Sequence, residues 1–268
     1  MQAAEILRAA PERPWPTPTR PWAMTQVWRD LLFAHWPIPA PAMASLLPPG
    51  LTLDTWAGEA WIGVVPFRMT DVTLRGLPQV PPFNRLLETN VRTYVTLDDR
   101  PGVYFFSLDA DNPVMVEIAR VWYHLNYFNA RFACGFPYPD DPSPVVRYHV
   151  ARTDRRARPG VFAGYYQPIG APFTATPGSI EEWLTARYCL YSVDRAGRIS
   201  RGEIHHQPWP LQLAEGEIEV NTLASSHGLT LPDTAPLLHF ARRLDVVAWP
   251  ITPIAPNSAP TPPLNAAN

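Results

Sequence analysis

Residues 88–110 read ETNVRTYVTLDDRPGVYFFSLDA, and this stretch decides the fold. Two runs rich in β-branched and aromatic residues, 91–97 and 103–108, flank a loop of turn-forming residues at 98–102. The first run alternates, so its odd-numbered side chains share one face of a strand and its even-numbered side chains share the other. The pattern predicts a hairpin of two antiparallel strands.

Strand-like runs recur along the chain. The run GEAWIGVVPF at residues 58–67 follows a turn at Ala57-Gly58. A second hairpin is predicted over residues 190–199, with its turn at 194–197. A third hairpin is predicted to turn near Glu215-Gly216, and residues 244–248 form a further expected strand.

Helix signals are few. Asn112-Pro113 is typical of a helix N-terminus, with asparagine as the cap and proline at the first helical position, and it predicts a helix within residues 114–125. Ser179 with Glu182 forms a capping box before a short helix, and residues 41–47 predict another. Many strands with few helices predict the α+β class, with a mainly antiparallel curved sheet or a closed β-barrel or cone and a few peripheral helices.

Proline marks the predicted domain boundaries. The 268 residues include 34 prolines, many of them near the two ends. Proline lacks an amide donor and favours extended backbone. We therefore expect proline-rich flexible tails at residues 1–21 and 251–268, around a single domain at residues 22–250.

The chain contains no lysine, and all 22 of its basic residues are arginine. No side-chain amine can therefore form a Schiff base with a carbonyl substrate. A net charge of -2 gives no global bias toward nucleic acid or anionic membranes. The four arginines at 152, 155, 156 and 158 are interpreted as a solvated loop rather than a nucleic-acid patch.

The cysteine and hydropathy patterns bear on metal binding and on the expected cellular location. Cys134 and Cys189 are the only cysteines, and no spacing typical of a zinc site occurs. No signal-peptide-like run and no apolar stretch long enough to span a bilayer is present. We expect a cytoplasmic protein that binds no membrane. The sequence also lacks the nucleophile elbow, the Walker loop and the dinucleotide fingerprint.

Several segments, in order, resemble the YqjF-like family of uncharacterised bacterial proteins. They are LLFAHWPIP (31–39), LDTWAGEAWIGVVPF (53–67), ETNVRTYV (88–95), PGVYFFSLDA (101–110), ARVWYHLNYFNA (119–130), LTARYCLY (184–191) and HHQPWPLQ (205–212). The resemblance covers most of the chain between Trp22 and Pro250. It implies an acetoacetate-decarboxylase-like fold, in which antiparallel strands surround an interior pocket.

The same resemblance bears on the site. In the wider superfamily a reactive lysine pair lies in a segment ending G-x-P-K-K-x-A. The similar stretch here is HLNYFNA at 124–130, which places Tyr127 and Phe128 at the two lysine positions. The superfamily's glutamate, on an earlier strand, resembles Glu88.

Glu88 and Arg92 belong to a polar row. In a strand the side chains at 88, 90, 92 and 94 share a face, and here they are Glu, Asn, Arg and Tyr. If the row faces a polar lumen, Glu88 can move a proton and Arg92 can clamp a carboxylate. If it faces solvent, these are ordinary surface side chains, with Glu88 in an ion pair.

Other candidates are Tyr127 as a hydrogen-bond donor to a substrate oxygen, and Asn126, His124 and His206 as substrate-binding residues. The alternative for each is a structural role. His205 and His206 are adjacent, so on a strand they point to opposite faces and cannot chelate one metal together. We therefore expect no metal and no cofactor. Arg187 and Arg120 are interpreted as structural ion-pair candidates, with Asp109 as an acidic partner.

These patterns predict a pocket protein that binds a small oxygenated molecule, either a carboxylate or a carbonyl compound. Turnover, if the pocket supports it, is expected to be lyase- or isomerase-like chemistry on a small carbonyl acid without a Schiff base, with Glu88, Arg92 and Tyr127 as catalytic residues. The alternatives are a non-catalytic ligand-binding or sensing module, and an interaction protein that uses its proline-rich tails. We expect no nucleic-acid partner, and a homo-oligomer is possible.

Overall fold

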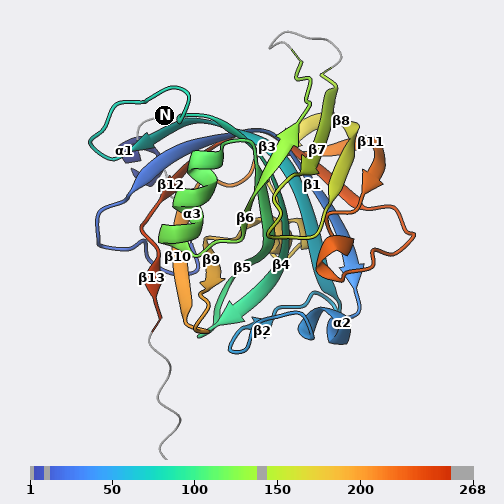
Figure 1. Cartoon of the computed structure of the whole chain (residues 1–268), viewed down its shortest axis with the longest axis horizontal. Coiled ribbons are helices and arrows are strands. Elements are labelled where there is room, and N and C mark those ends of the chain that lie inside the picture. The colour runs from blue at the N-terminus through green and yellow to red at the C-terminus, as the bar shows by residue number, and fades with distance from the viewer. Residues whose placement is uncertain (1–2, 9–12, 138–143, 255–268) are drawn as a thin grey trace, which may run out of the picture.

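The computed structural model describes residues 3–8, 13–137 and 144–254 (Figure 1). Its helices are α1 (Ala3–Arg8), α2 (Ala40–Ala44), α3 (Pro113–Tyr123), α4 (Ile180–Thr185) and the 3-10 turn η1 (Ser225–His227). Its strands are β1 (Met24–Ile38), β2 (Thr52–Leu53), β3 (Ala60–Leu74), β4 (Leu86–Leu97), β5 (Arg100–Ala110), β6 (Tyr127–Phe132), β7 (Val146–Arg152), β8 (Val161–Phe173), β9 (Cys189–Val193), β10 (Ile199–His206), β11 (Leu211–Asn221), β12 (Leu237–Ala248) and β13 (Thr252–Pro253).

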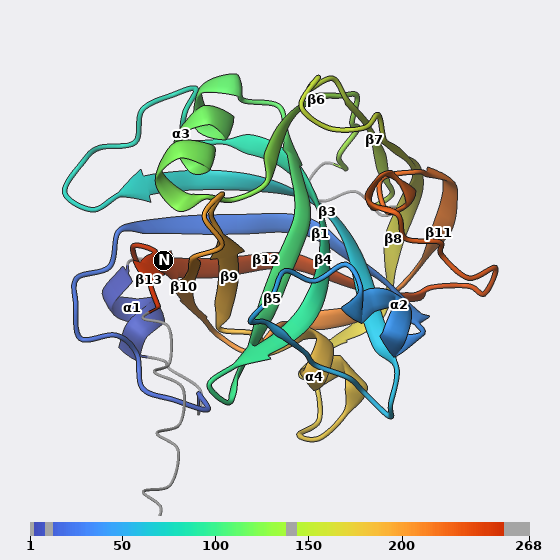
Figure 2. The ribbon, with the colours of Figure 1, turned by 60° about the horizontal axis from the view of Figure 1, so that its bottom comes forward.

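The strands form one curved sheet that closes on itself. The hydrogen-bonded order runs β13-β10-β9-β5-β6-β7-β8-β11-β12-β1-β3-β4-β2, with additional pairings of β10 with β12 and β5 with β4. These two pairings close a ring through β5, β9, β10, β12, β1, β3 and β4. Helix α3 lies outside the strands at one opening of this ring (Figure 2). The predicted class, a mainly antiparallel curved sheet with a few peripheral helices, is confirmed.

The decisive hairpin forms as predicted. Strand β4 pairs antiparallel with β5, from Leu97 opposite Arg100 to Glu88 opposite Ala110. Asp98 and Asp99 make the turn with φ of 52° and 56°, in the left-handed region that aspartate tolerates better than most residues. The hairpin of β9 and β10 also forms.

Both predicted helix caps are present. The Asn112 side chain accepts a hydrogen bond from the Met115 amide at the start of α3. The Ser179 hydroxyl accepts from the Glu182 amide at the start of α4, and the Glu182 carboxylate accepts from the Gly178 amide at 2.6 Å. The bonds to the Met115 and Glu182 amides satisfy donors that the first helical turn leaves unpaired, and the bond from Gly178 holds the residue before the cap.

The prediction of a turn at Glu215-Gly216 is wrong, because β11 runs straight through these residues. Gly216 is needed for close approach to the neighbouring strand β8. A Cβ at Gly216 would lie 2.1 Å from the carbonyl oxygen of Tyr165, which no side chain tolerates. The glycine therefore marks tight strand packing rather than a change of direction.

Strand β4 separates two interior regions. On one side Val91 packs in a large apolar core with Leu32, Ile62 and Tyr148. On the other side Leu86 belongs to a second cluster that includes Phe67 and Trp209. Every residue from Glu88 to Val95 is buried, so both faces of β4 are covered by protein. The polar row of β4 therefore has to lie inside the molecule.

The interpretation of Arg152 as part of a solvated loop is wrong. Its side chain is fully buried and donates from Nε and Nη2 to the two carboxylate oxygens of Asp109, at 2.6 and 2.7 Å. Asp109 is therefore not the partner of Arg187, which pairs instead with Asp54 at 2.6 Å. The Arg152–Asp109 pair joins β7 to β5 across β6, the strand that begins at Tyr127.

The described parts of the N-terminal segment pack against the domain. Ile6 of α1 is buried in a cluster with Val247 and Trp249. Trp15 donates its indole N–H to Glu203 at 2.9 Å. Most of the predicted C-terminal tail lies outside the described residues, whereas β13 pairs with β10. The extent of the flexible tails stays a prediction.

Among the described helices, none is long and apolar enough to cross a membrane.

We predict that Arg152→Met lowers the free energy of unfolding by about 3–5 kcal/mol, because it leaves the Asp109 charge buried without a partner. Replacing both partners, as Asp109→Leu with Arg152→Met, should restore much of that loss. Urea denaturation of the three proteins measures both quantities. A single variant as stable as the wild type would contradict the assignment of this pair as a structural link.

Candidate active site

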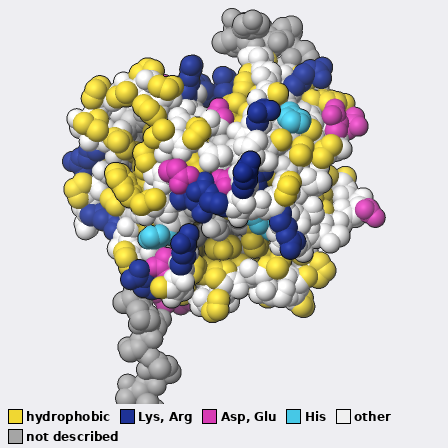
Figure 3. All heavy atoms as spheres, in the orientation of Figure 1, with side chains coloured by type: hydrophobic (Ala, Val, Ile, Leu, Met, Phe, Trp, Pro, Cys, Tyr) yellow, Lys and Arg dark blue, Asp and Glu magenta, His cyan; other side chains and the backbone are white. Residues whose placement is uncertain are grey.

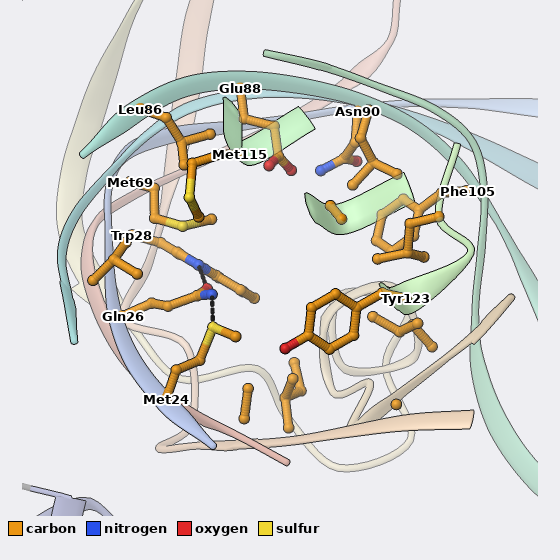
Figure 4. Close-up of a pocket in the computed structure, with 18 of the residues that line it drawn as sticks. Met24, Gln26, Trp28, Met69, Leu86, Glu88, Asn90, Phe105, Met115 and Tyr123 are labelled. Atoms are coloured by element: carbon orange, nitrogen blue, oxygen red, sulfur yellow. Dashed lines mark hydrogen bonds between the residues drawn. The ribbon is translucent and has the colours of Figure 1, made fainter. Parts of the chain in front are cut away.

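A cavity of about 430 Å³ lies inside the ring of strands. Strands β1, β3, β4, β5, β9 and β10 supply its walls, and α3 covers one side. Most of its lining is apolar, and three methionines, Met24, Met69 and Met115, point into it (Figure 4). A cavity of this volume and lining is typical of a small-molecule site. No pattern in the sequence singled out these methionines, since they resemble any other core residue.

The polar row of β4 faces this cavity. Glu88, Asn90 and Arg92 all line it, and Glu88 and Asn90 project from the same wall in Figure 4. Opposite Arg92 on β3 is Gly63, where a Cβ would lie 2.9 Å from His35 Nε2 and 3.4 Å from Arg92 Cγ. Glycine at this position leaves room for both side chains.

Glu88 and Tyr127 form a buried acid pair. The Tyr127 hydroxyl donates to Glu88 Oε2 at 2.7 Å. Glu88 is 3% exposed, and burial raises the pKa of its carboxyl to about 7, although hydrogen bonds from Tyr127 and Asn90 act in the opposite direction. Burial, together with the nearby Glu88, raises the pKa of Tyr127 well above its ordinary value. At neutral pH the tyrosine stays protonated and the glutamate is poised between its two states.

Arg92 is a buried cation without an acidic partner. No carboxylate of the described residues forms an ion pair with it, although it is only 9% exposed. Its contacts are hydrogen bonds of 3.3 Å to the Tyr94 hydroxyl and 3.4 Å to the Leu184 carbonyl, and the face of the Phe33 ring. Its Nε is buried without a hydrogen-bond partner. A buried charge of this kind normally requires an opposite charge.

Arg187 lines the cavity as well. One arm of its guanidinium is bound to Asp54, and its Nη2 is buried without a partner. Arg187 forms an ion pair as predicted, although with Asp54 rather than Asp109, and no pattern in the sequence indicated that it reaches the cavity. Arg92 and Arg187 together carry two positive charges against the single charge of Asp54.

His206 is held neutral beside this polar end. Burial lowers the pKa of its imidazole to about 4. Nδ1 lies 2.6 Å from the carbonyl oxygen of Gln207, which can only accept, so Nδ1 carries the proton. Within the described ranges, no group of three His, Cys, Asp or Glu side chains is placed to hold a metal ion.

Two predicted substrate-binding residues lie elsewhere. His124 ends α3 in the left-handed conformation, and Asn126 donates its side-chain amide to the Phe105 carbonyl at 3.1 Å. Both line a separate charged cleft that also contains Arg156 and Asp194. The structure thus brings together Glu88, Arg92, Tyr127 and His206 around the cavity, but not His124 or Asn126.

Solved structures share this arrangement of strands. The enduracididine biosynthesis enzyme MppR, complexed with pyruvate, matches with a TM-score of 0.63 and 11% identity, over 90% of this chain and 94% of that chain. An acetoacetate-decarboxylase-like enzyme from Sphingomonas wittichii RW1 matches with a TM-score of 0.59 and 14% identity, over 91% of this chain and 99% of that chain. Acetoacetate decarboxylase from Legionella pneumophila matches with a TM-score of 0.56 and 14% identity, over 90% of this chain and 92% of that chain. These likenesses establish an acetoacetate-decarboxylase-like fold.

Comparison of sequences identifies the family to which the chain belongs. Residues 25–245 match the DUF2071 family model, described as an uncharacterized conserved protein. The chain is 44% identical over 230 residues to the uncharacterized protein YqjF of Bacillus subtilis (strain 168), covering 86% of this chain and 92% of that protein. The chain therefore belongs to this YqjF-like family, and the resemblance found in the sequence is confirmed.

The raised pKa of Glu88 makes a testable contribution to stability. An unfolded glutamate titrates near 4.5 and the folded one near 7, so the folded state binds the proton more tightly. The stability that this proton provides is present below pH 4.5 and is lost as the pH rises through 7, at a cost of about 3 kcal/mol.

Glu88→Gln removes this titration. We expect the melting temperature of the variant to rise relative to that of the wild type between pH 5 and pH 8. Paired thermal melts cancel the titration of the buried histidines, which both proteins share. A difference in melting temperature that does not change with pH would show that Glu88 ionises normally.

Proposed function

We propose that this protein binds a small carboxylic acid that also bears a carbonyl group, and that it moves a proton next to that carbonyl without forming a Schiff base. The observation that carries the proposal is the buried Arg92, which has no carboxylate partner among the described residues and lies at the polar end of a mostly apolar cavity. A bound carboxylate would supply the negative charge that the protein does not.

The polar end is suited to a planar anion. Arg92 Nε and Arg187 Nη2 are buried donors without partners among the described residues. Guanidinium groups hold carboxylates through paired, charge-assisted hydrogen bonds. A carboxylate bound between these two guanidinium groups would supply hydrogen-bond acceptors that the described residues do not.

Glu88 is suited to proton transfer. A carboxyl with a pKa of about 7 is populated in both forms at neutral pH, so it can take and return a proton. As a base it would remove a proton from the carbon beside the carbonyl, and the electron pair of that C–H bond would form an enolate. Arg92 would stabilise the enolate oxygen. Delivery of the proton from Glu88 to that oxygen would give the enol isomer, whereas its return to the carbon would restore the substrate and would appear as exchange with solvent.

The absence of lysine separates this chemistry from imine-based decarboxylation. Tyr127 stands where the resemblance places a lysine of the superfamily, and it donates to Glu88 rather than attacking a carbonyl. Borohydride should trap no carbonyl substrate on a side chain of this protein.

The step can be measured without knowing the final product. We predict that the protein accelerates exchange of the C3 protons of 2-oxobutanoate for deuterium in D2O, followed by proton NMR. Glu88→Gln should slow that exchange by about 100-fold or more, because general base catalysis typically contributes at least this factor. Arg92→Ala should weaken binding about tenfold or more, through the lost charged hydrogen bonds.

Matched exposed residues provide the controls. Glu219→Gln on β11 and Arg131→Ala on β6 change the same residue types outside the cavity, and both should leave exchange and binding unchanged. Exchange at the wild-type rate in Glu88→Gln would remove Glu88 from the mechanism. Binding that requires Arg92 but gives no exchange in any 2-oxo acid would instead assign a sensing or carrier role.

A further inference from the structure

We propose that the acid carries an unbranched apolar chain of about six to ten carbons, which lies along the methionine-lined half of the cavity and points to the opening beside α3. This inference rests on the proposed function, since it takes the acid group to be held at Arg92. It adds the chemical class of the rest of the molecule.

The cavity becomes less polar along its length. The residues of β4 that face it run Arg92, Asn90, Glu88 and Leu86, and at about 3.3 Å per residue this row spans about 20 Å. On β3 the paired positions continue with Met69, opposite Leu86. One end therefore offers charge and the other offers mainly apolar surface.

The apolar half is shaped for a flexible chain. Met24, Met69 and Met115 surround it in Figure 4, and methionine is unbranched and adapts to irregular shapes. The one amide there, Gln26, is already satisfied. Its oxygen accepts from Trp28 Nε1 at 2.9 Å, and its nitrogen lies 3.1 Å from the sulfur of Met24. The Tyr123 hydroxyl is the other polar group that points into this half in Figure 4, and the rest of its lining is apolar.

The opening is apolar too. Leu77 and Val80, on the loop between β3 and β4, are 57% and 52% exposed, and Trp122 on α3 is 71% exposed, yet all three line the cavity. Hydrophobic side chains gather over this part of the surface in Figure 3. Contiguous exposed apolar residues around an opening are typical of a binding groove.

The volume of the cavity limits the length of the apolar chain. A cavity of 430 Å³ has room for about 14 groups the size of a water molecule. A carboxylate and a carbonyl occupy a few of them, which leaves space for about six to ten methylene groups.

A homologous series tests the proposal on the wild-type protein. Titration calorimetry with acetate, butanoate, hexanoate, octanoate and decanoate, at concentrations below micelle formation, should give a Kd that falls about fourfold per methylene and then levels off near decanoate. Octan-1-ol should bind the wild type more weakly than octanoate. In Arg92→Ala the two should bind alike.

A blocking variant locates the chain. Leu86→Trp should weaken octanoate at least tenfold while changing butanoate less than twofold. Leu213→Trp, at an exposed leucine outside the cavity, should change neither. The melting temperature of each unliganded variant checks that it folds.

The outcomes separate the two proposals. Equal affinity along the series, with binding still lost in Arg92→Ala, overturns the apolar chain and leaves the acid site standing. If affinity rises along the series, octanol binds as tightly as octanoate and Arg92→Ala changes neither, the acid site is overturned and an apolar pocket remains. Affinity that is highest for butanoate and falls with length overturns the apolar chain.

Discussion

Burial of β4 on both faces is the constraint on which the rest of this structure depends. One face completes the apolar core with Val91, and the other carries Glu88, Asn90 and Arg92 into the cavity. Ionisable groups cannot be buried without partners or a shift in their pKa. Glu88 has a raised pKa and accepts a hydrogen bond from Tyr127, and the Arg92 guanidinium lies over the aromatic rings of Phe33 and Tyr94. The character of the site follows from how each group meets this requirement.

Local structure was predictable from the sequence because its causes are local. The turn at Asp98-Asp99 and the caps at Asn112 and Ser179 depend on residues a few positions apart. Features set by distant strands were not predictable. The role of Gly216 depends on the backbone of Tyr165 on another strand, and the burial of Arg152 depends on Asp109, 43 residues earlier. Nothing near these residues in the sequence indicates their partners.

The candidate site was likewise predictable only where local sequence determines it. Alternation placed Glu88 and Arg92 on one face, and the resemblance to the superfamily brought Tyr127 beside them. The face that points inward could be determined only once both sides of β4 were seen to be covered. His124 and Asn126 were assigned by nearness to Tyr127 in the chain. The left-handed turn at His124 instead leaves both residues along an outer cleft.

Helix α3 joins the opening of the cavity to the acid pair. Its Trp122 lies at the rim, while its Arg120 donates at 2.7 Å to the backbone carbonyl of Tyr127, whose hydroxyl holds Glu88. The rim of the cavity and the residue that hydrogen-bonds to the buried carboxyl are therefore attached to one rigid element. A shift of α3 would move the backbone of Tyr127 together with the rim.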